Sequence, residues 1–297
     1  METGYSVALG TFDGLHKGHM AVLNAALSFK VLIPIAVTFD EPPKRKTTSS
    51  FVPMLLTAKE KNRRLKEMGF KEIFVLDYEE IHNLSPTNFL DMLFRKYNIK
   101  AVACGFNYRF GKNGEGDAAL LSDYCHSNHA EAVILPATQM SGQVVSSSLI
   151  RNLIANGNIT LANSLLGRPF YFKNKVVHGE KRGRKIGCPT VNIELDDQLV
   201  TPKYGVYASM VNIDGVNYPA VTNIGIRPTF LLKKPISETY IIGFEGDLYD
   251  EELDLNLLDY IREEVCFDGL EELKAAIEGD KETAIKAFKS GIYGIEL

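Results

Sequence analysis

Several features are missing from this 297-residue sequence, and each absence narrows the class of protein. No apolar run approaches the length of a membrane-spanning helix, and the N-terminus shows no charged segment followed by the apolar stretch of a secretory leader. The four cysteines, at positions 104, 125, 188 and 266, form no Cys-x-x-Cys pair. This spacing disfavours zinc binding and a disulfide scaffold, and it is typical of a reducing compartment, so we expect a cytoplasmic protein.

An excess of positive charge is also lacking. The formal net charge of −4 argues against a general nucleic-acid-binding protein, which would normally be basic. We therefore expect neither nucleic acid nor membrane as a partner, and the sequence fixes no oligomeric state. The apolar fraction of 45% is sufficient for a sizeable core, and the length suits about two domains.

A glycine-rich stretch at 9–19, LGTFDGLHKGH, organises the first half of the chain. It lies between a short apolar run at 6–9, which predicts a buried strand, and a helical pattern at 20–29. His16 and His19 stand three residues apart at the helix start, so they share a face. Free N–H groups and the positive dipole end make a helix start a phosphate site, which we favour over a surface or capping role. The stretch is neither a Walker A loop nor a dinucleotide fingerprint.

Strand and helix patterns alternate through the rest of this half and predict a parallel sheet with right-handed crossovers. Strands are expected at 31–38, 72–76, 101–105 and 132–136, and helices at 57–68 and 86–97. The polar, basic, proline-rich segment 41–50 is expected to be a loop.

Two later stretches carry further polar side chains. In GFNYRFGK, at 105–112, an extended backbone would send Asn107 and Arg109 to one side. In VSSSLIR, at 145–151, a helix N-cap explains one serine. Three hydroxyls with Arg151 one turn further on also suit a phosphate, because arginine binds phosphate oxygens bidentately.

These motifs resemble the nucleotidylyltransferase domain of prokaryotic bifunctional riboflavin kinase/FAD synthetases. The resemblance implies an α/β parallel-sheet domain of the HxGH type, in which His16 and His19 are catalytic. It also implies that a set of loop residues binds the nucleotide: Gly10, Phe12, Asp13, Gly18, Asn107, Ser147, Ser148 and Arg151. Two positions depart from the family pattern, because Pro42 replaces the histidine of an Asp-Pro-His-Pro run and Phe106 stands where an acid is common.

The residue pattern changes near residue 165. From there on, β-branched residues and tight turns predict an antiparallel barrel or sandwich. Two short helices broken at Gly157 are expected over 151–166, and two more over 270–289, broken at Gly279. A basic glycine-rich loop at 178–187 is followed by Pro-Thr-Val-Asn. Thr190 and Asn192 share a strand face, and their oxygens suit Mg²⁺.

The second half resembles the riboflavin kinase domain of the same family, an antiparallel β-barrel with C-terminal helices. The resemblance implies Mg²⁺ on Thr190 and Asn192, and Glu238 as the general base. By itself, Glu238 at a strand start is also explained as a solubilising charge on an edge strand. Family positions further imply ATP phosphates at Gly179, Arg182, Gly183 and Gly187, and flavin at Tyr249 and at a helix-start arginine, Arg262.

The predicted organisation is an FMN adenylyltransferase domain at 1–165 and a riboflavin kinase domain at 166–297. The implied substrates are ATP, riboflavin and FMN, with Mg²⁺ as cofactor. The alternative is a riboflavin kinase alone, with a weakened first domain, which Pro42 and Phe106 motivate. A flavin-binding regulator without turnover would be expected to lack the base or the metal ligands, and both are present.

Overall fold

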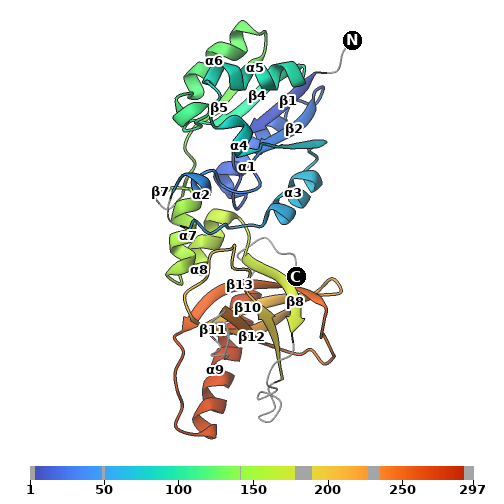
Figure 1. Ribbon diagram of the computed structural model, residues 1–297. Coiled ribbons are helices and arrows are strands. Elements are labelled where there is room, and N and C mark those ends of the chain that lie inside the picture. The colour runs from blue at the N-terminus through green and yellow to red at the C-terminus, as the bar shows by residue number, and fades with distance from the viewer. Residues whose placement is uncertain (1–3, 49–50, 141, 178–188, 227–234, 291–297) are drawn as a thin grey trace. The chain divides into compact units, whose positions relative to one another are not determined.

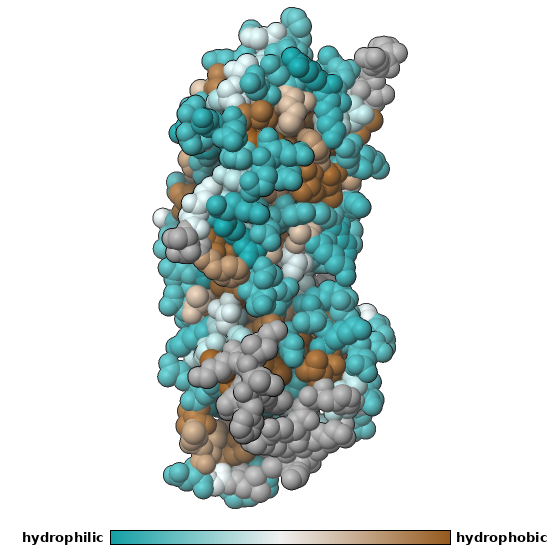
Figure 2. All heavy atoms as spheres, viewed as in Figure 1, coloured by the Kyte–Doolittle hydropathy of each residue, from teal (hydrophilic) through white to brown (hydrophobic). Residues whose placement is uncertain are grey.

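The computed structural model describes residues 4–48, 51–140, 142–177, 189–226 and 235–290 (Figure 1). The chain forms two compact units, Met1–Ser147 and Ser148–Leu297. Hydrophilic side chains cover most of the visible surface of the described residues (Figure 2). Among the described helices, none is long and apolar enough to span a bilayer.

The N-terminal unit is built on a five-stranded parallel sheet in the order β3-β2-β1-β4-β5, which confirms the predicted fold class. Its strands are β1 (Tyr5–Leu9), β2 (Ile33–Thr38), β3 (Glu72–Val75), β4 (Ile99–Gly105) and β5 (Glu131–Leu135). Its helices are α1 (Lys17–Leu27), α2 (Lys44–Thr47), α3 (Ala58–Glu67), α4 (Tyr78–Ile81), α5 (Pro86–Lys96) and α6 (Ala118–Ser127), with a 3₁₀ turn η1 (Lys112–Gly114). A small hairpin, β6 (Gln139–Met140) and β7 (Gln143–Val144), precedes α7 (Ser147–Ala155).

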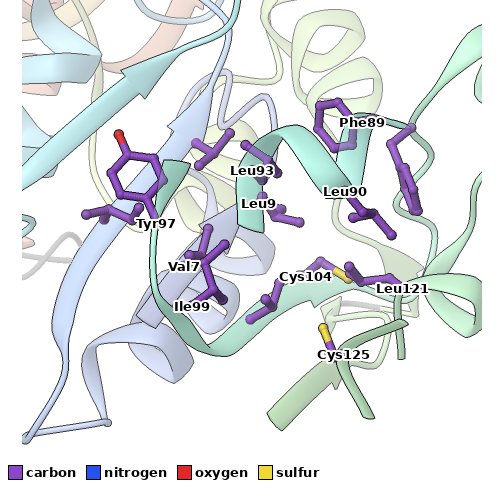
Figure 3. Packing of buried hydrophobic residues seen from close by; sticks show 14 of the residues in the cluster. Val7, Leu9, Phe89, Leu90, Leu93, Tyr97, Ile99, Cys104, Leu121 and Cys125 are labelled. Atoms are coloured by element: carbon purple, nitrogen blue, oxygen red, sulfur yellow. The ribbon is translucent and has the colours of Figure 1, made fainter. Parts of the chain in front are cut away.

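Alternation along the strands gives the sheet two different faces. Ala36, Ala8 and Ala103 lie in register across β2, β1 and β4. Their small side chains let α1, which contacts all three strands, approach the sheet closely. The other face carries the larger side chains. Figure 3 shows part of this core, where Val7 and Leu9 of β1 lie close to residues of α5.

The segment expected to be a loop at 41–50 contains the short helix α2. Pro43 takes the N-cap position with φ −52° and ψ −28°, so its ring holds the chain in helical geometry. The backbone N–H of Arg45 donates to the carbonyl oxygen of Pro42 at 2.9 Å. The prolines that predicted a loop therefore start a helical turn.

The C-terminal unit is a closed antiparallel barrel in the order β10-β11-β12-β9-β8-β13, with β13 pairing back to β10. Of the barrel and sandwich alternatives, the structure selects the barrel. Its strands are β8 (Phe170–Val177), β9 (Thr190–Glu194), β10 (Gly205–Ile213), β11 (Val216–Ile226), β12 (Pro235–Ile241) and β13 (Glu252–Arg262). Two helices accompany them, α8 (Ile159–Leu166) and α9 (Leu270–Lys289), and Gly157 separates α7 from α8 as predicted.

The prediction of a break at Gly279 is wrong, because α9 is one continuous helix of 20 residues. A glycine inside a helix costs only about 1 kcal/mol. Tertiary contacts offset that cost, since Ala284 packs in a buried cluster with Ala208, Met210 and Leu258 of the barrel wall. Intrinsic propensity was overridden by packing on the barrel.

Candidate active sites

The loop after β1 has an unusual backbone. Phe12 and Leu15 have positive φ angles of 53° and 46°, and Gly14 has φ 86°. Side chains larger than glycine rarely adopt this region, so the conformation needs support from the surroundings. Burial supplies it, because Phe12 is 1% exposed and Leu15 is 4% exposed. The loop is thus held in one shape at the carboxyl end of the central strand.

Asp13 fastens this loop through both its side chain and its backbone. Its Oδ1 accepts a hydrogen bond from the backbone N–H of Leu55 at 2.9 Å. Its carbonyl oxygen accepts one from Ser147 Oγ, also at 2.9 Å. Both residues were predicted to contact nucleotide, and in this structure they hold the loop in place.

His16 and His19 lie together at the start of α1, as predicted. His16 is the N-cap residue, and its Nδ1 accepts a hydrogen bond from the backbone N–H of His19 at 3.2 Å. The two rings stack with centroids 3.5 Å apart and planes inclined by 17°. Gly18 makes room for this arrangement, since a Cβ there would lie 3.2 Å from the His16 ring. Because Nδ1 of His16 accepts this hydrogen bond, a neutral His16 ring carries its hydrogen on Nε2.

The environment of His19 favours a neutral ring. Burial lowers the pKa of His19 well below its usual value, and the nearby charges of His16 and Lys61 lower it further. The ring of Phe12 meets His19 edge to face at 5.6 Å. The buried Nδ1 atom of His19 has no hydrogen-bond partner among the described residues. A neutral imidazole offers one donor and one acceptor, so the His19 ring can give a single hydrogen bond to an anion.

Asn107 lies after β4, which neighbours β1, but the expected extended backbone is absent there. The N–H of Tyr108 donates to the carbonyl oxygen of Gly105 at 2.9 Å, so a turn encloses Asn107. Asn107 and Phe106 are both exposed at this strand end. Alternation along an extended strand therefore does not apply to Asn107 and Arg109, because local hydrogen bonding bends the chain. The position of Asn107 at the carboxyl end of a sheet strand still suits ligand contact.

The other predicted phosphate residues come from two separate parts of the chain, Gly10 directly after β1 and the start of α7. Gly10 directly follows β1, and its N–H donates to the carbonyl oxygen of Val37 at 3.2 Å. Ser147 begins α7 and ends the N-terminal unit. Ser148 and Arg151 follow within the same helix, at the start of the second unit, and their nucleotide contacts stay a prediction.

Lys61 of α3 was not singled out from the sequence. It is 2% exposed, and its Nζ donates to backbone carbonyl oxygens at the ends of β1 and β2. It stands in AKEKNRRLKE, where a charged run normally indicates a solvated helix face. Nothing in that pattern distinguishes Lys61 from its exposed neighbours.

Glu238 lies in the middle of β12, between two asparagines. The register places it opposite Asn223 of β11 and opposite Asn192 of β9. Directly opposed residues in an antiparallel pair share a face, so the three polar side chains point to one side of the barrel wall. The alternative of an edge-strand charge is wrong, because β12 is paired on both sides within a closed barrel.

Thr190 and Asn192 share that face of β9, as predicted from alternation. Asn192 is 4% exposed. A hydroxyl and an amide oxygen are hard, uncharged metal ligands, and they suit a cation that also takes phosphate oxygens as ligands. In the part of the chain that the structure describes, no three His, Cys, Asp or Glu side chains gather as a metal cluster. The donor set therefore fits a metal that arrives with phosphates.

Asn223 is a second residue that deserved more weight from the sequence. Its Nδ2 donates to Glu264 Oε1 at 2.8 Å. Its buried Oδ1 has no hydrogen-bond partner among the described residues. A buried, unsatisfied acceptor is costly, so the Oδ1 atom of Asn223, on the strand opposite Glu238, is a candidate contact for a ligand or a water molecule.

Arg262 ends β13, so the prediction of a helix-start arginine is wrong. Its guanidinium forms two hydrogen bonds with Asp280 of α9, Nε to Oδ1 at 3.1 Å and Nη2 to Oδ2 at 2.7 Å. Tyr249 lies in the loop between β12 and β13 and is half-buried. The predicted loop residues Gly179, Arg182, Gly183 and Gly187 lie outside the described residues.

Comparison with known protein families assigns both units. A family model described as FAD synthetase matches residues 1–149, and one described as riboflavin kinase matches residues 166–288. The chain belongs to the bifunctional riboflavin kinase/FAD synthetase family.

Two relatives of this family illustrate the match. The bifunctional riboflavin kinase/FMN adenylyltransferase of Bacillus subtilis (strain 168) is 33% identical over 293 residues, which cover 96% of this chain and 92% of that protein. The enzyme of the same name from Escherichia coli (strain K12) is 34% identical over 294 residues, covering 97% and 94%. Since the matches span both units, the chain carries an FAD synthetase domain and a riboflavin kinase domain of a transferase.

A solved structure agrees with this architecture over nearly the whole chain. The crystal structure titled as a macrolide-efflux protein from Streptococcus pneumoniae has 32% sequence identity and a TM-score of 0.88. It covers 96% of this chain and 94% of its own. The families of this kinase and adenylyltransferase generally use a divalent metal.

Proposed function

We propose that this chain makes both flavin cofactors, phosphorylating riboflavin to FMN and adenylylating FMN to FAD. The presence of both family domains carries the proposal. The stacked His16 and His19 support the second reaction, and Glu238 opposite Asn192 supports the first. We also place the functional boundary near residue 165, because the two family matches end at 149 and begin at 166.

In the kinase reaction, the 5′-hydroxyl of riboflavin attacks the γ-phosphorus of ATP and ADP leaves. Glu238 accepts the hydroxyl proton as the new O–P bond forms. Thr190 and Asn192 would hold Mg²⁺, which would supply neutralisation of the charge on the ATP phosphates. Tyr249 and Arg262 contact the flavin, while Gly179, Arg182, Gly183 and Gly187 contact the phosphates.

In the adenylyl transfer, a phosphate oxygen of FMN attacks the α-phosphorus of ATP and pyrophosphate leaves. This nucleophile is already ionised at neutral pH, so no protein base is required, and catalysis depends on positioning and electrostatic stabilisation. His16 and His19 donate hydrogen bonds to the ATP phosphates at the start of α1, where the N–H groups add to the attraction. Asn107, Ser148 and Arg151 complete the nucleotide contacts.

Separating the flavin products by chromatography tests both reactions. Wild-type protein with ATP and Mg²⁺ is expected to convert riboflavin to FMN and FAD, and supplied FMN to FAD. FMN production without FAD from either substrate would leave the kinase-only alternative. None of the comparisons favours that alternative, since the FAD synthetase model matches residues 1–149.

Two substitutions separate the sites. His19→Ala should abolish FAD formation and preserve riboflavin phosphorylation, with His126→Ala on the exposed face of α6 as a matched control. Asn192→Ala should do the reverse, slowing FMN formation while FAD still forms from supplied FMN. Loss of both reactions in a variant that melts like wild type would refute independent sites.

A further inference from the structure

We propose that Lys61 is a positioning residue for adenylyl transfer: its ammonium group holds the histidine-bearing loop against the segment that follows β2. The inference rests on the proposed FAD synthetase function. Lys61 belongs to none of the motifs considered in the sequence analysis, and it lies in α3, outside the loop that it supports.

The contacts of Lys61 are all to backbone. Its Nζ lies 3.3 Å from the carbonyl oxygen of Thr11 and 3.5 Å from that of Asp40, and it also donates to the carbonyl oxygen of Phe39. An ammonium group has three donors and no acceptor, so these three oxygens use its full capacity. A group occupied in this way cannot also bind a substrate phosphate. Its role is therefore to position other residues.

The loop needs such a clamp because its backbone is strained. Thr11 directly precedes Phe12, the first of the residues with positive φ. The Thr11 carbonyl oxygen also accepts a hydrogen bond from Thr38 Oγ at 2.9 Å. Lys61 thus adds to the hydrogen bonds of Gly10 and Thr38 that join the carboxyl ends of β1 and β2, and among the described contacts it is the charged donor there.

The charged groups around Lys61 come from each element packed against it. Asp13 of the loop and Asp40 after β2 attract the ammonium, and His19 of α1 is repelled by it. Burial nevertheless dominates and lowers the pKa of Lys61 to about 8, while the two carboxylates oppose that shift. The charged form therefore prevails below about pH 8 and is lost as the pH rises above it. A neutral amine would turn a lone pair toward carbonyl oxygens and loosen the clamp.

Three variants test the proposal by steady-state kinetics of FAD formation from FMN and ATP. Lys61→Met keeps most of the side-chain volume and removes the donors. We expect its kcat to fall about 10- to 100-fold, because small misplacements of catalytic groups have effects of that size. The KM for FMN should change by less than about threefold, since Lys61 touches no substrate. Lys66→Met makes the same change at an exposed position of α3 and should behave as wild type.

The pH profile supplies a readout that a purely structural role would not move. Wild-type kcat for FAD formation should decline as the pH rises through about 8. Lys61→Arg keeps a cation that does not titrate in this range, so its alkaline decline should disappear even if its rate is lower. Riboflavin phosphorylation by the same samples serves as the internal reference for protein concentration, because it takes place in the other unit.

Two results would overturn the role of Lys61: a wild-type kcat in Lys61→Met, or an unchanged alkaline decline in Lys61→Arg. The second result decides the matter even if Lys61→Met fails to fold. Absence of FAD formation from the wild-type protein would instead refute the proposed function, so the two failures are distinguishable.

Discussion

Replacing Asp280 with alanine is expected to destabilise the barrel unit and to weaken riboflavin binding. Asp280 lies on α9 and is 5% exposed. It holds the guanidinium of Arg262 at the end of β13 through two parallel hydrogen bonds. This bidentate pair fixes both the helix and the side chain that we assign to the flavin site. Removal of the Asp280 carboxylate is therefore expected to change both the stability of the unit and the binding of riboflavin.

The size of the effect follows from the exposure of the two partners. Removing one member of a fully buried pair costs about 3–5 kcal/mol, because an unpaired charge stays behind. The Arg262 side chain is 27% exposed and that of Asp280 is 6% exposed, so water can solvate part of the abandoned guanidinium. We therefore expect a loss of about 2–3 kcal/mol. For a unit of this size that corresponds to a fall in melting temperature of about 4–12 °C.

Differential scanning calorimetry, followed in parallel by loss of kinase activity on heating, measures the stability change. Glu278→Ala is the matched control on the same helix, since Glu278 pairs with Lys281 at 2.7 Å but is 68% exposed. Such a surface pair contributes less than about 1 kcal/mol. Equal stability losses in the two variants would refute the reasoning about the Arg262 pair. A destabilised Asp280→Ala protein with an unchanged KM for riboflavin would remove Arg262 from the flavin site.

Three further predictions concern the barrel unit and its chemistry. Glu238→Gln should lower the kcat for riboflavin phosphorylation by about 10²- to 10⁴-fold while leaving FAD formation from FMN intact, and equal rates would exclude it as the base. Chelation with EDTA should stop both reactions, and kinase activity surviving without a divalent ion would contradict the assignment of Thr190 and Asn192. Asn163→Ala should lower the free energy of unfolding by about 2–5 kcal/mol in urea titrations, because the Phe170 N–H and the Leu257 carbonyl oxygen lose buried partners. A loss below about 1 kcal/mol would show that these groups find new partners.

Local patterns were sufficient for the strands and for several helices of the N-terminal unit. Thr57 and Ser85 are helix N-caps whose side chains accept from the backbone three residues on, and the helices predicted after them are present. The stacking of His16 and His19 likewise follows from a spacing of three at a helix start. These features depend on residues near one another in the sequence, so periodicity and capping rules capture them.

What the sequence could not give depends on partners distant along the chain. Glu238 could not be placed between Asn192 and Asn223 without the barrel register. The continuity of α9 through Gly279 depends on packing against barrel strands, among them β10, which lies more than 60 residues earlier in the sequence. Lys61 donates to backbone oxygens, which every residue has, so its contacts could not be predicted from a pattern of side chains.

Because Lys61 bonds to backbone oxygens, its contacts do not depend on the two side chains, Pro42 and Phe106, that depart from the family pattern. The clamp at the site uses the carbonyl oxygens of Phe39 and Asp40, which precede the substituted position Pro42. Pro42 itself contributes a carbonyl oxygen to the turn that begins α2. Phe106 is 49% exposed after β4, and the core does not depend on it. Both departures therefore change side chains around the site, while the backbone framework that positions His16 and His19 is retained. This is the physical reason to expect adenylyl transfer in spite of them.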